Sequence, residues 1–553
     1  MSGAAEYDYV IVGAGSAGCV LAARLSAQPD LRVLLIEAGG WDRSLWIHIP
    51  LGWGKLQGSG LFDWGLEGEP EHALDNRRIE CARGKVIGGC SSVNAMAYVR
   101  GHPADYDRWA SRGLKSWSWS NVLEYFRRQE TWEDGASTYR GGSGPVLTCA
   151  SRYDDPVVGA WLDAGHSAGY PSTPDYNGAQ QEGFGALQLT VGNGRRSSAA
   201  SAYLRPALGR PNLEVWTNTT VQSITFEGKR ASGAICQRNG DIVRVRARRE
   251  VIVSAGAIHS PHLLMLSGIG DPEQLNRHGI PVHAALPGVG KNLQDHLWAS
   301  LEFERAVPSR FLREMRLDRA CAGLVQAMVL RSGFWTDLPS GWTAFVRTSD
   351  WEALPDIQLL FRAAPPGAAP WLAPFRSPVR EGFVCRAVLL RPQSRGSIEL
   401  ASARHHDAPR IHFNFLQTER DRRALRAGIR LIRQLAQQPA LKPFIVREVA
   451  AGPEAIADED LDAHIRRTSA TSHHPAGTCR MGSTDDEGAV VDERLRVIGL
   501  GALRVVDASV MPDLVGGNIN AAVLMIAEKA ADMILADAGG RFETGTAAMG
   551  SVN

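Results

Sequence analysis

The strongest constraint on the fold is a glycine-rich turn near the N-terminus. Residues 7–12 are rich in aromatic and β-branched side chains, and they lead directly into Gly-Ala-Gly-Ser-Ala-Gly at residues 13–18. Residues 19–25 then have the composition of a helix. In such a turn the first glycine allows the bend, the second lets backbone approach a pyrophosphate, and the third lets the helix pack on the strand. The motif predicts a phosphate site at the helix N-terminus, formed by Gly13, Gly15, Ser16, Ala17 and Gly18.

A second predicted strand completes a βαβ unit. Pro29 and Asp30 interrupt the helix, and residues 31–36 read as a parallel strand. Glu37 follows that strand, with Ala38 beside it, and its carboxylate is expected to accept hydrogen bonds from an adenosine ribose. The unit by itself does not distinguish FAD from NAD, because both present an ADP group.

Composition is that of a globular protein acting on small molecules. A length of 553 residues predicts roughly two to four structural units. Sixty basic residues against 59 acidic ones leave a net charge of +1, so we expect no overall attraction for nucleic acid or an anionic membrane. The eight cysteines are dispersed without a Cys-x-x-Cys pair, which predicts no metal site and is typical of reduced thiols in the cytoplasm.

The sequence also bears on location. Residues 1–8 lack the basic and apolar regions of a secretion signal, and no run of about 18 uncharged apolar residues predicts an integral membrane segment. We therefore expect a cytoplasmic protein for which any contact with the inner membrane is peripheral. The sequence leaves the oligomeric state open.

Three later segments place small residues next to predicted strands. Residues 83–96 hold glycines followed by small polar side chains, which suits backbone pressed against a flat polar ring. Residues 251–270 read as a buried strand, a small-residue turn and a helix closed by glycine. Residues 503–512 predict another strand, ending in an acid and two small residues. Taken singly, each segment is equally compatible with ordinary α/β turns.

In this order the segments resemble those of the glucose–methanol–choline (GMC) family of flavin oxidoreductases. The chain is most similar to the bacterial choline-dehydrogenase-like branch of that family, and the resemblance covers nearly the whole sequence. Its specific parts are residues 13–18, 83–94, 254–270, 288–296 (GVGKNLQDH), 471–482 and 515–522.

The resemblance implies FAD as cofactor and an α/β fold of two domains. A Rossmann-type FAD-binding domain would comprise residues 1–154, 195–300 and 465–553. A second, α+β substrate domain built on an antiparallel sheet would comprise residues 155–194 and 301–464. The further residues expected to bind FAD are Arg83, Gly88, Gly89, Ser91, Asn94, Ala95, Val221, Ala255, Gly256, Asp507 and Ala508.

The mode of FAD attachment follows from one position. Some family members tether FAD covalently through a histidine just before the asparagine of the first flavin segment, and here that position is Val93. An aliphatic side chain cannot form this bond. The resemblance therefore implies noncovalent FAD.

Two side chains near the C-terminus form the expected catalytic pair. The run from His474 to Cys479 resembles the active-site histidine motif of the family. A neutral imidazole, with an ordinary pKa of about 6.5, can take the hydroxyl proton of an alcohol while hydride leaves to flavin N5. The family places a histidine or asparagine about three turns before a basic residue of the last helix, here Lys529, and this identifies Asn518. Its amide would hydrogen-bond the substrate oxygen.

The start of the last helix carries two further expectations. Asn520 and Ala521 would lie near the pyrimidine end of the flavin, where a helix N-terminus favours negative charge. The alternative for Asn518 and Asn520 is a helix N-cap within a glycine turn, which is a common use of asparagine.

Other segments are interpreted as framework. Residues 41–64 predict a long loop that could cover the mouth of the site, and residues 362–378 predict an extended loop. Residues 419–434 carry six arginines, but apolar residues recur at helical spacing, so we expect a surface amphipathic helix with a solvated basic face. The pair His405 and His406 is interpreted as solvated surface.

The resemblance leaves the electron acceptor open. A dehydrogenase that reduces a quinone is favoured over an oxidase that reduces oxygen. A lyase or a photodecarboxylase on the same fold is a rival, whereas a flavoprotein without catalysis is disfavoured by His474 and Asn518. The alcohol is also open, because choline needs an aromatic cage and His473 stands where some choline-oxidising relatives have an aromatic residue. Tryptophans could instead line a pocket for an aromatic or aliphatic alcohol.

Overall fold

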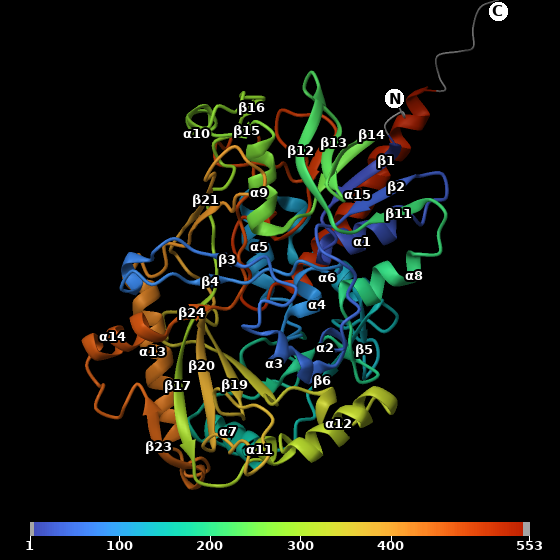
Figure 1. The fold of residues 1–553 in the computed structure, drawn as a ribbon. Coiled ribbons are helices and arrows are strands. Elements are labelled where there is room, and N and C mark those ends of the chain that lie inside the picture. Colours follow the sequence, from blue (N-terminus) through green and yellow to red (C-terminus); the bar gives the residue numbers. More distant parts are fainter. Residues whose placement is uncertain (1–4, 546–553) are drawn as a thin grey trace, which may run out of the picture.

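Five parallel strands form the sheet predicted from the N-terminal turn. In the computed structural model, which describes residues 5–545, strands remote in sequence lie side by side at the upper right of Figure 1. Each pairs in parallel with the next. Their order is β11 (Leu213–Trp216), β2 (Val33–Ile36), β1 (Ala5–Val12), β14 (Asp241–Val253) and β25 (Leu503–Val505).

One helix packs against this sheet, and a second helix lies beside the first. Helix α1 (Ser16–Leu25) begins three residues earlier than the sequence pattern indicates, because Ser16, Ala17 and Gly18 form its first turn. Helix α15 (Asn520–Gly545) runs along α1 (Figure 1), and Arg24 of α1 forms ion pairs with Glu528 and Asp532 of α15. The predicted strands and helices of the βαβ unit are therefore confirmed.

The parallel sheet has an antiparallel extension. The N-terminal half of β14 pairs with β13 (Arg230–Arg238), which pairs with β12 (Thr219–Glu227). Helix α9 (Gly256–Leu266) follows β14, and Gly268 just beyond it has φ +78°, in agreement with the predicted glycine closure.

A second sheet is wholly antiparallel and confirms the predicted fold class. Its order is β23 (Ile445–Ala450), β17 (Leu297–Arg305), β20 (Gly382–Leu389), β19 (Ile357–Arg362), β18 (Trp342–Val346) and β7 (Gly183–Ala186), with β24 (Ala470–Thr471) beside the start of β17. The exact division of the chain into two domains stays a prediction.

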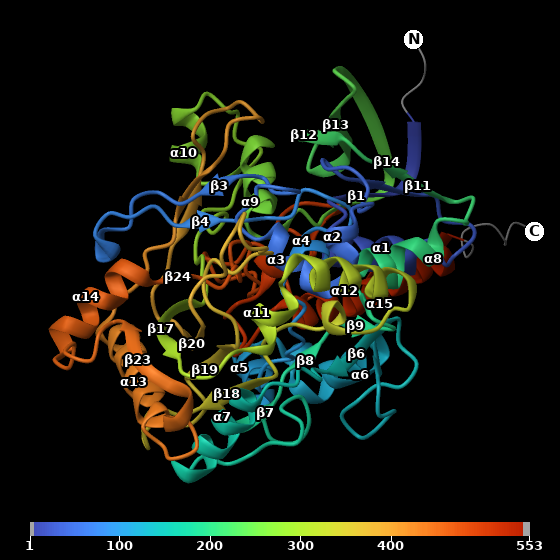
Figure 2. The ribbon, with the colours of Figure 1, turned by 60° about the horizontal axis from the view of Figure 1, so that its bottom comes forward.

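The two faces of the antiparallel sheet differ in chemistry. On the outer face, aromatic side chains of β17, β18, β19 and β20 pack around Trp161 of α7 (Pro156–Ser167). Helices α13 (Glu419–Ala436) and α14 (Asp458–Thr468) lie on this outer side in both views (Figures 1 and 2). Because side chains alternate along a strand, the opposite face carries Trp298, Gln358 and Arg386.

Two framework predictions need correction in part. The helix expected at 419–434 is confirmed, but its basic face is not fully solvated: the Arg426 side chain is only 8% exposed and forms ion pairs with Glu419, Asp458 and Asp462. The long loop expected at 41–64 contains the short helices α2 (Leu45–His48) and α3 (Trp53–Leu56). Apolar side chains of that segment contact neighbouring elements, and this tertiary packing stabilises turns that lack a local periodic pattern.

Shorter helices complete the structure. They are α4 (Cys90–Val93), α5 (Pro103–Ser111), α6 (Trp119–Gln129), α8 (Arg205–Ala207), α10 (Pro272–Arg277), α11 (Arg310–Glu314) and α12 (Leu317–Val329). Residues 363–378 form an irregular loop after β19, as expected. Across residues 5–545, no helix is both long and apolar enough to cross a membrane.

The contact between α1 and β1 yields a test of the fold. In Gly18→Ala the new Cβ would lie 1.9 Å from the carbonyl oxygen of Gly13, so α1 must shift away from the strand. We expect the free energy of unfolding to fall by about 1–3 kcal/mol. The matched control is Gly159→Ala, in the exposed face of α7, where a Cβ meets nothing within 4 Å. A thermal midpoint for Gly18→Ala equal to that of the control would contradict this packing.

Candidate active site

The predicted cofactor residues lie at the carboxyl ends of the parallel strands. Gly13 follows β1, Glu37 follows β2, Ala255 comes two residues after β14, and Asp507 comes two residues after β25. Ligands of open α/β sheets bind at this edge, in the loops beyond the strand ends. Four segments that are remote in sequence are therefore brought to one edge by the strand order.

Two glycine segments meet at this edge with no side chain between them. Gly13 has φ +99°, and a Cβ there would lie 2.5 Å from the carbonyl oxygen of Ser254. Gly89 has φ +52°, and its Cβ would lie 2.7 Å from the Cα of Gly15. The amide of Gly88 donates to the carbonyl of Ala14 at 2.7 Å. The first flavin segment thus lies directly on the phosphate turn.

The N-terminus of α1 suits a dinucleotide pyrophosphate. No side chain caps it, so the amides of its first turn keep donors free for an anion. The Ser16 hydroxyl donates to Oδ1 of Asn520 at 2.7 Å and so brings the start of α15 to the same place. Asn520 is the first residue of α15, with Ala521 next to it, and neither Asn518 nor Asn520 occupies the N-cap position. The residues present fit the diphosphate of FAD.

Two buried carboxylates shape the turns of this edge. Glu37 accepts hydrogen bonds from the amides of Ala14 at 2.9 Å and Gly39 at 2.8 Å, and burial raises its pKa to about 7. Asp507 accepts from the Gly256 amide at 2.8 Å and from the Ser260 hydroxyl at 2.5 Å, and burial raises its pKa too. This turn-forming role was not foreseen from sequence. The ribose contact of Glu37 stays a prediction.

The other predicted cofactor residues flank these turns. Val221 lies near the start of β12, and the amide of nearby Thr219 donates to the carbonyl of Glu37 at 2.9 Å. Ser91 and Val93 belong to α4, and Ala38 and Ala508 lie beside Glu37 and Asp507. Ala95 packs against a small apolar cluster.

A buried arginine that the sequence reading missed orders the first flavin segment. Arg196, 2% exposed, donates to both the carbonyl and the side-chain oxygen of Asn94 at 2.7 Å, and to the carbonyl of Ile47. Burial without a carboxylate partner lowers its pKa to about 9. Arg83, at the other end of the segment, donates to the carbonyl of His473 at 2.8 Å. The flavin segment is therefore tied to the histidine loop.

The predicted catalytic pair is in contact. Nε2 of His474 lies 3.2 Å from Nδ2 of Asn518, although the two residues come from different segments. The other ring nitrogen, Nδ1 of His474, lies 3.0 Å from Nδ1 of His296. His296 is fully buried and was not among the predicted site residues; the signal available was its place at the end of the matched run 288–296.

The hydrogen-bond pattern determines which nitrogen of His474 is the base. Nε2 of His296 lies 3.0 Å from the carbonyl oxygen of Leu390, which can only accept, so this nitrogen carries the proton. Nδ1 of neutral His296 is then an acceptor, and it takes a hydrogen bond from Nδ1–H of His474. The lone pair of His474 is left on Nε2, facing the amide of Asn518.

The orientation of Asn518 is set from the antiparallel sheet. Nε2 of Gln358, on β19, donates to Oδ1 of Asn518 at 3.4 Å. The NH2 group of Asn518 therefore faces His474. Gln358 is 1% exposed and was also absent from the sequence prediction, because its position depends on the register of β19.

A buried carboxylate holds the histidine loop in place. Asp295 accepts from the amide of His474 at 2.9 Å and from the hydroxyl of Thr471. Thr471 in turn accepts from the amide of His473 at 2.7 Å. Burial raises the pKa of Asp295 to about 6. Backbone and side chain of the loop are thus fixed by the residue next to His296.

Electrostatics keep His474 neutral. Burial lowers its pKa well below 6.5, and the neighbouring His296, His473 and Arg83 lower it further. The pKa of His473 is lowered to about 3, chiefly by burial. An imidazole in this setting keeps its Nε2 lone pair at neutral pH, which is the form that a general base requires.

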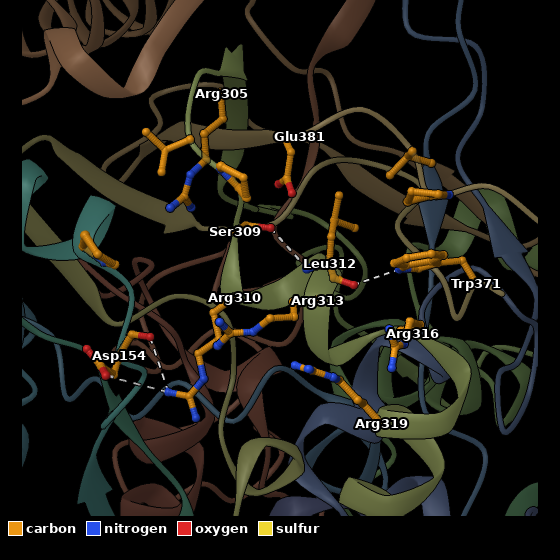
Figure 3. A pocket seen from close by; sticks show the side chains of 15 residues that line it. Asp154, Arg305, Ser309, Arg310, Leu312, Arg313, Arg316, Arg319, Trp371 and Glu381 are labelled. Atoms are coloured by element: carbon orange, nitrogen blue, oxygen red, sulfur yellow. Dashed lines mark hydrogen bonds and ion pairs between the residues drawn. The ribbon is translucent and has the colours of Figure 1, made fainter. Parts of the chain in front are cut away.

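A cavity of about 600 Å³ lies elsewhere (Figure 3). It opens between the end of β17 and helices α11 and α12, and its labelled side chains include Arg310, Arg313, Arg316 and Arg319. None of the predicted site residues lines it. Within residues 5–545, no cluster of three or more side chains suited to a metal ion is found.

Comparison with known proteins gives two family matches. The models described as GMC oxidoreductase match residues 7–298, for the N-terminal part of the family, and residues 392–527, for the C-terminal part. Among curated proteins, the oxygen-dependent choline dehydrogenase of Vibrio vulnificus is 44% identical over 96% of this chain and 94% of that protein. The mitochondrial choline dehydrogenase of Homo sapiens is 43% identical over 96% of this chain and 90% of that protein.

Two solved structures of similar shape are named as oxidases. A pyridoxine 4-oxidase from Mesorbium loti superposes with a TM-score of 0.84 at 34% identity and covers 95% of this chain and 98% of its own. A formate oxidase from Aspergillus oryzae superposes with a TM-score of 0.89 at 27% identity and covers 97% of this chain and 99% of its own.

The proton positions in the histidine pair can be tested directly. Neutron diffraction from deuterium-exchanged crystals is expected to show deuterium on Nε2 of His296 and on Nδ1 of His474, and none on Nε2 of His474. Hydrogen bonding to the Leu390 carbonyl imposes this arrangement. Deuterium on Nε2 of His474 at neutral pH would contradict the assignment of the lone pair.

Proposed function

We propose that this chain, which belongs to the GMC oxidoreductase family, oxidises an alcohol to the aldehyde or ketone with His474 as general base. The enzyme is an FAD-dependent flavoprotein, and the cofactor is bound noncovalently. The observation that carries the proposal is the Nε2 lone pair of His474 facing the NH2 group of Asn518. A substrate hydroxyl that lies beside both groups would donate to the one and accept from the other.

FAD would be held by the turn and strand-end residues described above. The amides of Ser16 and Ala17 would bind its diphosphate at the α1 N-terminus, and the edge around Glu37 and Val221 would receive the adenosine. Residues 83–95 and the start of α15 would hold the flavin end. When bound, FAD supplies the acceptor for the hydride.

Three residues would carry the proton chemistry. Nε2 of His474 takes the hydroxyl proton, and the amide of Asn518 donates to the developing alkoxide oxygen. Once protonated, His474 still donates through Nδ1 to His296, so the positive charge gains a charge-assisted hydrogen bond. His296 acts as a positioning residue, because the Leu390 carbonyl keeps its Nδ1 an acceptor.

We propose a dehydrogenase that passes electrons to a quinone. The human relative, named a mitochondrial choline dehydrogenase, supports this choice. The name of the Vibrio vulnificus relative, an oxygen-dependent choline dehydrogenase, supports oxygen as the acceptor. The solved structures of an oxidase that acts on pyridoxine and of a formate oxidase support the alternative, in which oxygen is the acceptor. Re-oxidation of the reduced enzyme by oxygen, compared with a soluble quinone, separates the two.

We also propose a cytoplasmic location with peripheral contact to the inner membrane. The outer side of α12 supports this, since Val325, Val329 and Leu330 are 58%, 72% and 68% exposed. Exposed Arg316 precedes this helix and exposed Arg319 lies in its first turn. A helix that combines exposed apolar side chains with arginines suits the interface of an anionic bilayer.

The role of His474 is tested by His474→Ala. We expect the variant to retain FAD but to lose anaerobic flavin reduction by an alcohol by more than about a hundredfold, because the general base is gone. The measurement is bleaching of the flavin band on mixing with a panel of primary alcohols. His406→Ala, on an exposed histidine, is the control. Near-normal reduction by His474→Ala would remove this residue from the mechanism.

The membrane surface is tested by sedimentation with lipid vesicles. We expect the wild type to bind phosphatidylglycerol vesicles more strongly than phosphatidylcholine vesicles, and the double variant Val325→Asp, Val329→Asp to lose at least about tenfold in affinity. The control is Ile242→Asp, at a 59% exposed position on β14. Equal binding by the double variant and the control would contradict this surface.

A further inference from the structure

An arginine without an acidic partner lies on the sheet face that lines the site. Arg386 is on β20, whose register sets it opposite Ser300 of β17 and Leu360 of β19. Gln358 lies two residues from Leu360 and points to the same face, since side chains alternate along a strand. Because Gln358 contacts Asn518, Arg386 is on the same face as the catalytic pair and one row away.

A second contact places Arg386 near the histidine loop. Its guanidinium lies over the ring of Trp298, 4.2 Å from the centroid. The indole N–H of Trp298 donates to the carbonyl of Thr471 at 3.0 Å, three residues before His474. The charge of Arg386 is also felt by His473, whose pKa it helps to lower. Both contacts therefore place the guanidinium near the histidine loop.

The guanidinium keeps all its donors unused by the protein. Within the described part of the chain, the Arg386 side chain has no hydrogen bond or ion pair, and its guanidinium lies against the Trp298 ring. Glu302, further along β17, attracts it but lies beyond ion-pair distance, and Arg362 repels it. Arg386 is half-buried on the site side of the sheet.

This charge would be costly to leave without a counterion. Burial lowers the pKa of Arg386 to about 10, so the side chain is still a cation at neutral pH. The buried Arg100 and Arg305 have carboxylate partners, Glu130 and Asp155. Buried Arg196 lacks one, but carbonyl and amide oxygens accept its hydrogen bonds, whereas among the described residues the Arg386 side chain has neither kind of partner. A guanidinium that is pre-ordered over an aromatic ring matches the planar, bidentate geometry of a carboxylate.

We propose that the alcohol substrate carries a carboxylate, which Arg386 binds while the hydroxyl contacts both His474 and Asn518. The inference rests on the proposed function and names the substrate class of that site. Neighbouring strands lie about 4.8 Å apart and two residues span about 7 Å, so the carboxylate is several bonds from the carbinol carbon. A quaternary ammonium would meet a like charge at this position, which separates this chain from relatives named as choline dehydrogenases.

The test compares matched alcohols in anaerobic flavin reduction. The probes are para-(hydroxymethyl)benzoate, its neutral methyl ester, and choline. The quantity compared is the rate constant of flavin reduction divided by the dissociation constant of the alcohol. For the wild type we expect this ratio to be at least about tenfold higher for the carboxylate than for the ester or choline. In Arg386→Gln the preference for carboxylate over ester should fall by about thirtyfold or more, through the dissociation constant, and Arg386→Lys should restore part of it. Arg447→Gln, which removes an exposed cation from β23, should keep the preference.

Failure of this inference is distinguishable from failure of the proposed function. If the ester or choline reduces the flavin as well as the carboxylate does, the alcohol chemistry stands and the carboxylate site is overturned. If no alcohol reduces the flavin, binding decides: benzoate should perturb the flavin spectrum at concentrations at least about tenfold below benzamide, and only with Arg386 present. Equal binding of benzoate and benzamide overturns the inference, and the measured FAD content of each variant shows that it is folded.

Discussion

The hydrogen bond between His296 and His474 is the interaction on which the arrangement of the site depends. His296 directly precedes β17 of the antiparallel sheet, and His474 follows β24, which pairs with β17. Beyond His474, the chain pairs with the segment that follows β25, through the amide of Gly477 and the carbonyl of Ala508. One loop therefore joins both sheets, and the imidazole is fixed where they meet.

The same contact explains how a neutral base is maintained among cations. Arg83 and Arg386 lie near the histidine loop, and burial removes water that would solvate an imidazolium. The substrate proton is instead accepted at Nε2 of His474, whose Nδ1–H already donates to His296. A site that is positive at rest suits an anionic substrate and disfavours a cationic one, so the base and the proposed carboxylate site have a common electrostatic origin.

Local sequence predicted the elements whose residues interact with near neighbours. The strand, glycine turn and helix of residues 5–25, the helix at 419–436 and the start of α15 all appear within a few residues of where pattern and glycine placement indicate. The prediction was wrong where distant packing decides the outcome. The short helices of residues 45–56 depend on neighbouring apolar clusters. Arg426 is buried because Asp458 and Asp462 of α14 form ion pairs with it.

The sequence by itself determined that a dinucleotide turn and a histidine–asparagine pair are present, because glycine spacing and the family motifs each lie within a short run of residues. Only the tertiary structure decided which nitrogen of His474 holds the lone pair. That choice depends on His296, which contacts both His474 and the Leu390 carbonyl, and Leu390 is 84 residues from His474 along the chain. It likewise decided that Gln358 orients Asn518 and that Arg386 lacks a counterion. Strand register sets both, and register arises from packing across the whole sheet.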